Sequence, residues 1–286
     1  MTAALARPDP SGDPLGERIG DREFCLFQQL IHRRAGIWLA PAKKALLVGR
    51  LSRRLRELGI QSFRSYHELV LADPKEEVRL LDAITTNETH FFREPRHFEL
   101  LERQILPSFA TGRVPGRSLR VWSAGCSTGE EPYSIAMLLR RHLGSAADAC
   151  SEVLATDLST RVLARANDAV WPLEKSREIP KDLLTAYALR GTGTQEGRFK
   201  IAPEVRALVR FQRFNLYEDD YGALGTFDLI FCRNVLIYFD ATSKARVVER
   251  LADVLRPGGY LFLGHAETLN GVTTRLRAAI PTVYTS

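Results

Sequence analysis

Long apolar runs are missing from this sequence of 286 residues. No stretch approaches the roughly 18 consecutive apolar residues that a membrane-spanning helix needs, so we expect no membrane insertion. The segment Met1–Gly20 also lacks the apolar core of a signal peptide, and its prolines, glycines and charges predict a flexible tail. These absences favour a cytoplasmic protein.

Closely spaced cysteines are missing as well. The sequence has four cysteines, with no C-x-x-C pair among them: Cys25, Cys126, Cys150 and Cys232. This spacing indicates neither a zinc knuckle nor a dithiol redox centre, so we expect no metal site. Free thiols persist in a reducing compartment, which again favours the cytoplasm.

Acidic residues are scarce in one segment. Between Leu30 and Tyr66 the only acidic residue is Glu57, whereas basic residues are frequent: Arg33, Arg34, Lys43, Lys44, Arg50, Arg53, Arg54, Arg56 and Arg64. The local excess of positive charge is larger than the +6 of the whole chain. Such a basic field predicts an acidic partner, which by composition alone is a nucleic acid, a membrane surface or an acidic protein.

Residues 22–107 have the apolar spacing of helices. One amphipathic run, in a helix predicted over 42–58, consists of Leu47, Leu51, Leu55 and Leu58. Glycines stand where helices should end and prolines near where they should begin: Gly36, Gly59, Pro41, Pro74 and Pro95. This pattern predicts a small N-terminal helical domain.

The rest of the chain alternates between predicted strands and predicted helices. Strands are expected over residues 119–123, 152–156, 209–214, 227–231, 260–264 and 282–284. Helices are expected over 130–143 and 242–255, and also after Ser159, whose side chain would cap the helix. This alternation predicts an α/β domain with a doubly wound, mostly parallel sheet.

One stretch, residues 172–206, interrupts this alternation. It holds a Pro-bounded helix over 180–189, a glycine-rich run over 190–197 and a short strand over 198–201. We interpret it as an inserted small antiparallel β-subdomain.

A glycine turn, Gly125–Gly129 (GCSTG), follows the first predicted strand. Glycines in this position let the backbone turn tightly and approach a ligand closely. Glu130 and Glu131 then begin a helix, where they would oppose a pyrophosphate and suit a ligand with a cationic amino group. Because the spacing falls short of G-x-G-x-x-G, a plain turn before a capped helix stays open.

Asp157 closes the second predicted strand. An acid there accepts hydrogen bonds from both ribose hydroxyls of an adenosine, although it would also serve as a cap for the following helix. Farther along, the turn Leu255–Leu261 (LRPGGYL) resembles one that recurs in S-adenosylmethionine-dependent methyltransferases. That resemblance favours the sulfonium cofactor over a dinucleotide.

Four longer motifs follow one another along the chain: Thr86–Glu94 (TNETHFFRE), Trp122–Ser134, Phe227–Phe239 (FDLIFCRNVLIYF) and Gly264–Glu267 (GHAE). Together they resemble the chemotaxis receptor methyltransferase family, CheR. In the last motif alanine replaces the serine of the family's Gly-His-Ser-Glu. The likeness extends from about Phe24 to Tyr284.

The resemblance implies an enzyme that moves a methyl group from S-adenosylmethionine to glutamate carboxylates of chemotaxis receptors, with S-adenosylhomocysteine as the other product. It implies a receptor-binding helical domain over 21–92, a linker helix over 93–112 and a methyltransferase domain over 113–286. It also implies a monomer whose partners are the cytoplasmic helices of the receptor.

The resemblance assigns roles to particular residues. Arg93 and Tyr238 would be the catalytic pair, although a surface ion pair for Arg93 and a place in the core for Tyr238 stay open. Residues implied to contact the cofactor are Asn87, Thr89, Arg93, Gly125, Glu131, Asp157, Asn215, Leu216, Arg233 and Asn234. Among these, Glu131 would hold the methionine amino group and Asp157 the ribose.

Two surfaces are candidates for receptor binding. Arg50, Arg53 and Arg56 step along one face of the predicted helix and would attract acidic receptor helices, unless they form only a solvated polar face. Gly191 and Gly193 lie in a run that resembles the loop of family members that dock on a receptor C-terminal peptide by strand addition. A hairpin turn without a partner is the alternative.

Two other classes of function stay open. A nucleic-acid methyltransferase would share the cofactor and the basic surface, but it needs aromatic stacking partners for a base. The sequence shows no such base-binding cluster beside Arg233 and Asn234, so we expect no nucleic-acid partner. A protein that only senses the cofactor would not need both Arg93 and Tyr238.

Overall fold

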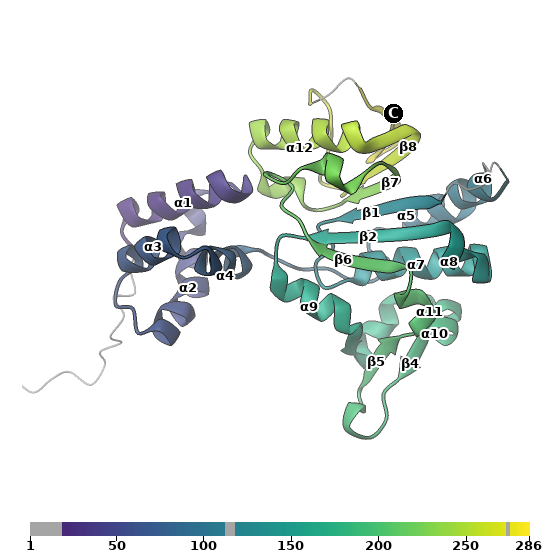
Figure 1. The fold of residues 1–286 in the computed structure, drawn as a ribbon, viewed down its shortest axis with the longest axis horizontal. Coiled ribbons are helices and arrows are strands. Elements are labelled where there is room, and N and C mark those ends of the chain that lie inside the picture. Colours follow the sequence, from purple (N-terminus) through teal and green to yellow (C-terminus); the bar gives the residue numbers. More distant parts are fainter. Residues whose placement is uncertain (1–18, 112–117, 273–274) are drawn as a thin grey trace, which may run out of the picture. The chain divides into compact units, whose positions relative to one another are not determined.

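The computed structural model describes residues 19–111, 118–272 and 275–286 (Figure 1). All of the predicted tail except Ile19 and Gly20, and the last residue of the predicted linker helix, lie outside these ranges. The chain divides into two compact units, one comprising residues up to Arg33 with Trp38–Ile84, the other Arg34–Ile37 with Thr85–Ser286. No described helix is long and apolar enough to cross a membrane.

The first unit is helical, as the apolar spacing predicts. Its elements are α1 (Asp21–Ala35), a 3-10 turn (Pro41–Lys43), α2 (Lys44–Leu58), α3 (Phe63–Ala72) and α4 (Pro74–Ile84). Gly59 ends α2 in the left-handed conformation, with φ of 67°, and its N–H donates to the carbonyl of Arg56. A residue with a Cβ would be strained there, which explains the glycine signal.

A buried ion pair holds the helices of this unit together. The apolar face of α2 is buried at Leu47, Leu51 and Leu55. Beside it, Glu76 of α4 is buried and accepts two hydrogen bonds of 2.7 Å from Arg54 of α2. Tyr66 of α3 donates another at 3.0 Å. Because the carboxylate is both paired and hydrogen-bonded, its burial is tolerated.

The second unit is built on a seven-stranded sheet in the order β6-β2-β1-β7-β8-β10-β9. Its strands are β1 (Leu119–Ala124), β2 (Ser151–Asp157), β6 (Val209–Arg213), β7 (Phe227–Cys232), β8 (Leu255–Leu263), β9 (Arg277–Ile280) and β10 (Val283–Thr285). The strands from β6 to β8 are parallel, and β10 is antiparallel to both of its neighbours. The predicted, mostly parallel sheet is confirmed, although β9 was not predicted.

The helices of this unit are α5 (Pro95–Leu100), α6 (Leu106–Thr111), α7 (Glu130–Leu143), α8 (Ala147–Cys150), α9 (Thr160–Asp168), α10 (Lys181–Tyr187), α11 (Pro203–Arg206) and α12 (Ala241–Val254). A π-helical turn, Leu101–Ile105, joins α5 to α6. In Figure 1, α7 and α12 lie on opposite sides of the sheet.

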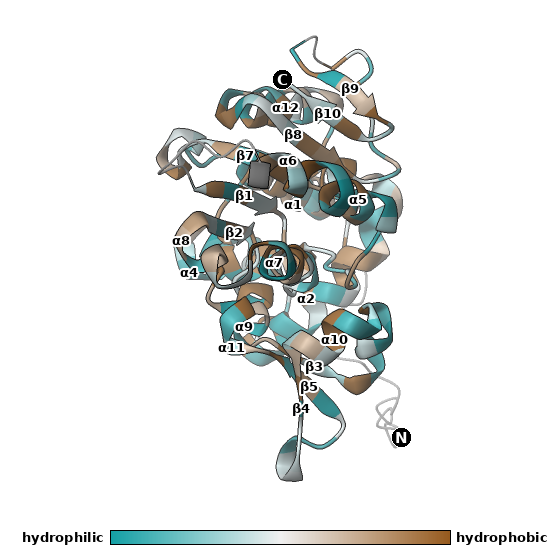
Figure 2. Cartoon of the chain, turned by 90° about the vertical axis from the view of Figure 1, so that its right-hand side faces the viewer, coloured by the Kyte–Doolittle hydropathy of each residue, from teal (hydrophilic) through white to brown (hydrophobic). Residues whose placement is uncertain are grey.

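Neighbouring residues of the central parallel strands enter different cores, because side chains alternate along a strand. Val121 and Leu229 join the core under α7, whereas Trp122 and Ile230 join the core under α12. Hydrophobic residues accordingly run along the strands and along the helices next to them (Figure 2). Burial on both faces explains the nearly continuous apolar run of the central strand β7, whereas β6 at the sheet edge is partly exposed and alternates with polar residues.

The insertion forms a three-stranded antiparallel sheet in the order β3-β5-β4, with bounds Val170–Pro172, Arg198–Ile201 and Ala188–Arg190. Trp171 of β3 stacks on Phe199 of β5 with ring centroids 6.0 Å apart. The predicted antiparallel β-subdomain is confirmed, but only β5 was predicted as a strand. The strand β4 lies at the edge of this sheet.

The segment between α4 and α5 belongs to the second unit. Sequence analysis placed the end of the helical domain at Phe92, whereas the structure divides after Ile84. The backbone N–H groups of Phe91 and Phe92 donate to the side chains of Glu178 and Ser134. Both acceptors lie in the second unit, which explains why this segment goes with the sheet.

Candidate active site

The glycine turn after β1 lies against the neighbouring strand ends. Gly125 and Gly129 have φ of 87° and 97°, a region that glycine enters without strain. The N–H groups of Gly125 and Cys126 both donate to the carbonyl of Thr156, at 2.8 Å. A Cβ on Gly125 would lie 2.4 Å from Cγ2 of Val235. Backbone conformation and close packing therefore both require glycine here.

Asp157, the last residue of β2, ties the glycine turn to the start of α9. Its Oδ2 accepts from the N–H of Ser127 at 2.8 Å, and its Oδ1 accepts from the N–H of Ser159 at 2.9 Å. Ser159 takes the predicted capping position, but its side chain makes no capping hydrogen bond, so that prediction was wrong in its chemistry. A carboxylate has about four acceptor sites, and a ribose contact by Asp157 stays a prediction.

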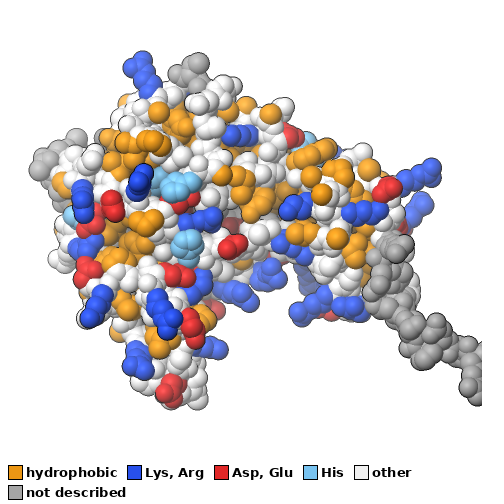
Figure 3. Space-filling view, turned by 180° about the vertical axis from the view of Figure 1, so that it is seen from behind, with side chains coloured by type: hydrophobic (Ala, Val, Ile, Leu, Met, Phe, Trp, Pro, Cys, Tyr) orange, Lys and Arg blue, Asp and Glu red, His pale blue; other side chains and the backbone are white. Residues whose placement is uncertain are grey.

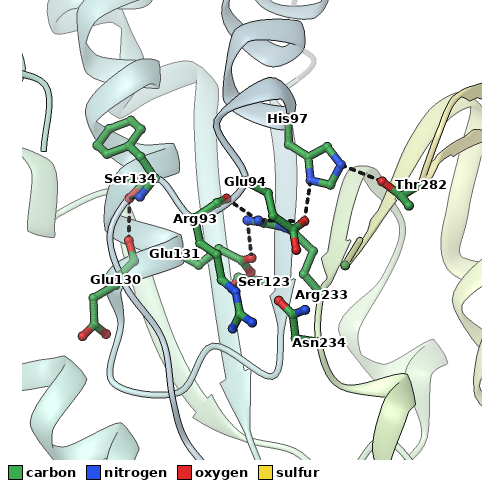
Figure 4. Close-up of polar contacts among 12 residues, drawn as sticks. Arg93, Glu94, His97, Ser123, Glu130, Glu131, Ser134, Arg233, Asn234 and Thr282 are labelled. Atoms are coloured by element: carbon green, nitrogen blue, oxygen red, sulfur yellow. Dashed lines mark hydrogen bonds and ion pairs between the residues drawn. The ribbon is translucent and has the colours of Figure 1, made fainter. Parts of the chain in front are cut away.

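The two glutamates that begin α7 point in different directions (Figure 4). Glu131 accepts a hydrogen bond of 2.7 Å from Ser123 and lies 3.1 Å from Nη1 of Arg233. Glu130 is completely buried and pairs with Lys175 instead, so only Glu131 remains for a cationic ligand group. Burial raises the pKa of Glu131, and the charge of Arg233 works against that rise.

Arg233 connects the strand end after β7 to the residues before α5. Its Nη2 lies 3.1 Å from Oε2 of Glu94 and also donates to the carbonyl of Arg93. The guanidinium lies over the ring of Phe98, 5.5 Å from its centroid, and the side chain is only 2% exposed. These contacts give Arg233 a role in orienting Glu131, in addition to the expected place beside the cofactor.

Glu94, His97 and His265 bring three atoms of metal-ligand type within 4.8 Å of one another. However, the guanidinium of Arg233 already lies 3.1 Å from Oε2 of Glu94 and would repel a cation there. Burial lowers the pKa of His97 to about 4, and Arg233 adds to this effect, so the ring is neutral at neutral pH. Both observations count against a cation at this cluster, and the absence of a metal site stays a prediction.

The Gly-His-Ala-Glu motif holds the turn that follows Arg233. Glu267 accepts hydrogen bonds from the N–H groups of Asn234 at 2.8 Å, Gly264 at 2.6 Å and Ile237 at 3.2 Å. Asn234 has a φ of 58°. A Cβ on Gly264 would lie 2.4 Å from Nδ2 of Asn234, so this close approach requires a glycine. Sequence reasoning missed this role of Glu267, although the motif itself was the signal.

The segment 87–93 contacts the glycine turn. Ser127 Oγ donates to the carbonyl of Asn87 at 2.9 Å, which brings the expected cofactor loop to the end of β1. The guanidinium of Arg93 donates to the carbonyl of Glu88 at 3.2 Å. In Figure 4 the side chain of Arg93 points away from the ion pairs of Arg233.

The remaining predicted site residues lie after β6 and β7. Tyr238 is half-buried in a 3-10 turn that follows β7. The side chain of Asn215 is buried, accepting from the N–H of Tyr217 at 3.0 Å and donating to the carbonyl of Arg34 at 2.6 Å. Leu216 is buried beside it. Because the amide of Asn215 already has these partners, the backbone of this turn is the better candidate for an adenine contact.

The predicted basic face of α2 is smaller than expected. Arg50 is half-buried and donates to the carbonyl of Ile84, the last residue of α4. The carbonyls in the last turn of a helix have no partner within the helix, and Arg50 supplies one. Arg53 is 84% exposed and pairs with Glu57 at 2.9 Å, and Arg56 is exposed. On the face drawn in Figure 3, Lys and Arg are common on the helical unit and acidic residues are few. Arg53 and Arg56 therefore remain as the candidates.

The predicted docking loop is a hairpin loop between β4 and β5. The N–H of Gly191 donates to the carbonyl of Arg198 at 2.9 Å, and a Cβ on Gly191 would lie 2.0 Å from the carbonyl oxygen of Gln195. Gly193 has a φ of 58°. Turn geometry alone thus accounts for both glycines. The neighbouring strand contributes an exposed apolar side chain, Leu189, at the sheet edge.

Two family models match this chain. The first, described as CheR methyltransferase, all-alpha domain, covers residues 22–85, and the second, CheR methyltransferase, SAM binding domain, covers residues 87–284. The chain belongs to the CheR family. Its division after Ile84 falls at the boundary between the two CheR models.

Curated CheR relatives match along most of their length. Chemotaxis protein methyltransferase 2 of Pseudomonas aeruginosa is 42% identical over 276 residues, which cover 93% of this chain and 95% of the relative. Chemotaxis protein methyltransferase of Escherichia coli is 40% identical over 268 residues, 93% of this chain and 91% of the relative. This CheR-family chain is an S-adenosylmethionine-dependent methyltransferase of chemotaxis.

Among solved structures, the N-methyltransferase NodS of Bradyrhizobium japonicum, in complex with S-adenosyl-L-homocysteine, has a TM-score of 0.33 and 16% identity, over 66% of this chain and 70% of that chain. At that score the likeness supports no conclusion about function. The CheR assignment depends on the family models and the curated relatives.

The charges at the strand ends fit S-adenosylmethionine. The cofactor has a cationic amino group, and Glu131 offers a carboxylate beside the glycine turn. Its ribose hydroxyls need acceptors, and Asp157 ends the adjacent strand. A pyrophosphate would meet these two carboxylates and be repelled. The two carboxylates therefore favour a sulfonium nucleoside over a dinucleotide.

Proposed function

We propose that this enzyme methylates glutamate side chains of chemotaxis receptors and forms methyl esters. The curated relatives are chemotaxis protein methyltransferases, which supports a chemotaxis protein as the substrate. The observation that carries the proposal is Arg93. Among the described residues its guanidinium makes one hydrogen bond, to the carbonyl of Glu88, and so keeps donors for an acceptor carboxylate.

The acceptor needs no general base. A glutamate has a pKa of about 4.3 and is already ionised at neutral pH. When bound, S-adenosylmethionine supplies an electrophilic methyl group on a positively charged sulfur. Arg93 would hold one oxygen of the acceptor and leave the other directed at the reacting centre. Tyr238 would donate a hydrogen bond that fixes the rotation of the carboxylate.

The contacts of Arg93 and Tyr238 with the acceptor carboxylate should be only moderately strong. The negative charge of the carboxylate disappears in the transition state, so a very tight contact would stabilise the ground state instead. Arg93 and Tyr238 are accordingly proposed to position the acceptor and exclude water, without proton transfer. Catalysis then depends mainly on alignment.

Two surfaces are proposed to recruit the receptor. Arg53 and Arg56 would attract acidic cytoplasmic helices of the receptor through long-range charge. The edge of β4, with its exposed Leu189, would pair with a C-terminal receptor peptide and raise the local substrate concentration. We further propose a monomer in the cytoplasm, where the free cysteines of this chain would stay reduced.

The proposal is tested by offering methyl-labelled cofactor with receptor-containing membranes, and in parallel with nucleic acid. A carboxyl ester is labile in alkali, whereas methyl groups on nucleobases are not. We expect label on the receptor that alkali releases. Label on nucleic acid, or alkali-stable label on protein, would rule the proposal out.

A further inference from the structure

The inserted subdomain holds the backbone of the loop that contains Thr89 and Arg93. Lys175 Nζ donates to the carbonyl of Thr89 at 2.9 Å, and Glu178 Oε2 accepts from the N–H of Phe91 at 2.9 Å. Both side chains come from one 3-10 helix, Leu173–Glu178, which follows β3. Each contact joins a charged side chain to a neutral backbone group, so each is stronger than an ordinary hydrogen bond.

Apolar packing joins the same two segments. Phe91 is buried, and its ring lies 5.0 Å from the ring of Trp171 and 6.0 Å from that of Phe199. Both partners belong to the inserted sheet. The loop is therefore attached to the insertion by two backbone contacts and by one buried aromatic side chain.

The loop is strained where it passes Arg93. Phe92 and Glu94, the two residues that flank it, have φ of 52° and 59°. A left-handed backbone is strained for a residue with a Cβ, and it persists only where the surroundings enforce it. The insertion supplies part of that enforcement, because Glu178 binds the amide next to Phe92.

The other side of the loop contacts the glycine turn, Gly125–Gly129, and Arg233. The carbonyl of Asn87 accepts from Ser127, and the carbonyl of Arg93 accepts from Arg233, which also pairs with Glu131. The loop thus lies between the insertion and the residues that fit the cofactor. If the insertion held the loop differently, both the position of Arg93 and the contact of the loop with the glycine turn would change.

Charge balance explains why the attachment is stable. Glu130 is completely buried at the start of α7, and Lys175 pairs with it while donating to Thr89. Removal of Lys175 would leave that carboxylate buried without its cation. Glu178, in contrast, makes only the contact with Phe91 among the described residues, and its removal leaves no buried charge.

We propose that Glu178 and Lys175 are positioning residues, through which the inserted subdomain fixes the Arg93 loop in the form that binds the cofactor and aligns the acceptor. The subdomain then has a role in catalysis besides any docking of receptor peptides. This inference depends on the proposed role of Arg93, but its effect on the loop and on cofactor affinity is measured without a receptor.

The test uses the full chain with Glu178→Ala, and with Glu178→Gln as the conservative variant that keeps an acceptor oxygen. Glu174→Ala is the matched control, since Glu174 is an exposed acid on the same 3-10 helix. Hydrogen exchange at residues 88–93 and at β1 is followed by mass spectrometry. The affinity for S-adenosylhomocysteine is measured by calorimetry, and melting temperatures confirm that the variants are folded.

In Glu178→Ala we expect faster exchange in residues 88–93, unchanged exchange in β1, and about tenfold weaker binding of S-adenosylhomocysteine. Glu178→Gln should restore most of the wild-type exchange protection and most of the affinity. Glu174→Ala should match the wild type in both measurements. Exchange and affinity in Glu178→Ala equal to those of Glu174→Ala would overturn the inference. So would faster exchange spread evenly over the sheet, which indicates general destabilisation. If the wild type binds the nucleoside but methylates no receptor, the proposed function fails while this result stands.

Discussion

The guanidinium of Arg233 lies 3.1 Å from the carboxylate of Glu131, and the two side chains are only 2% and 12% exposed. With little water to solvate either group, each depends on the other for its charge and direction. Ser123 fixes the second oxygen of the carboxylate at 2.7 Å. Glu131 is thereby held in one orientation before any ligand arrives, which lowers the entropic cost of binding.

Glu131→Gln should weaken cofactor binding. The amide keeps the shape of the side chain but removes the negative charge that complements a cationic amino group. We expect an affinity for S-adenosylhomocysteine that is lower by about tenfold or more in calorimetry. Glu99→Gln, at an exposed position of α5, is the control and should bind like the wild type. Equal affinity in the two variants would show that Glu131 does not contact the ligand.

Arg93→Ala should abolish most turnover while leaving the fold intact. Loss of the acceptor's alignment is expected to lower kcat by about a hundredfold. Arg93→Lys, which keeps the charge without the fork of donors, should recover only part of it. The control is Arg96→Ala, because Arg96 is an exposed arginine nearby. Near-normal methylation by Arg93→Ala, in a steady-state assay, would remove Arg93 from the mechanism.

Most of the fold could be predicted because local signals agree with the final structure. Gly59 ends α2, Pro74 and Pro95 begin helices, and the predicted bounds of α7 match those observed. The strands β4 and β9 were missed because they are mostly exposed and have few β-branched or aromatic residues, and β3 because it ends at Pro172 after three residues. The equally short β5 and β10 were predicted, because each has buried apolar or aromatic residues. Strands without such a pattern depend on their pairing partners, which the local sequence does not show.

The sequence could predict which strand ends come together at the candidate site, but not the contacts of the side chains there. Asp157 ends β2 and Glu131 lies in the first turn of the helix after β1, and the carboxyl ends of these two strands are neighbours, so the proximity of the two residues follows from topology. The partners of Arg233 do not, because Glu94 lies far away in sequence and meets it only in the folded chain. Arg50 shows the same limit, since helical spacing cannot reveal that it binds the end of α4.

The stability of the fold should depend on His97 in mild acid. Burial holds the pKa of His97 near 4, below its usual 6.5, while Arg233, Glu94 and His265 face its ring. Between these two pH values the unfolded chain binds a proton that the folded chain excludes, so the free energy of unfolding falls as pH falls. Urea titrations at pH 7 and pH 5 will measure the change.

The same titrations on His97→Gln give the control. That side chain does not titrate, so the dependence of unfolding on pH should be flatter than in the wild type over this range. A variant with the same slope as the wild type would show that another group is responsible.

Charge reversal at Arg53 and Arg56 should slow receptor methylation and spare cofactor binding. Loss of electrostatic attraction is expected to lower kcat/KM for the receptor by about tenfold at low ionic strength, and by less at high salt. Arg64→Glu is a suitable control, because Arg64 is 76% exposed on α3 of the same unit. If the control and the double variant are equally slow, the loss of net positive charge explains the effect, and the position of the charges on α2 does not.

The central claim is that the methyl group arrives on a receptor glutamate. Receptor treated with enzyme and S-adenosylmethionine at neutral pH is digested and sequenced by mass spectrometry, with Arg93→Ala as the inactive reference. We predict one added methyl group, located on glutamate side chains of the receptor's cytoplasmic helices and absent with the reference variant. Methylation confined to lysine, to another residue type or to another molecule would contradict the account.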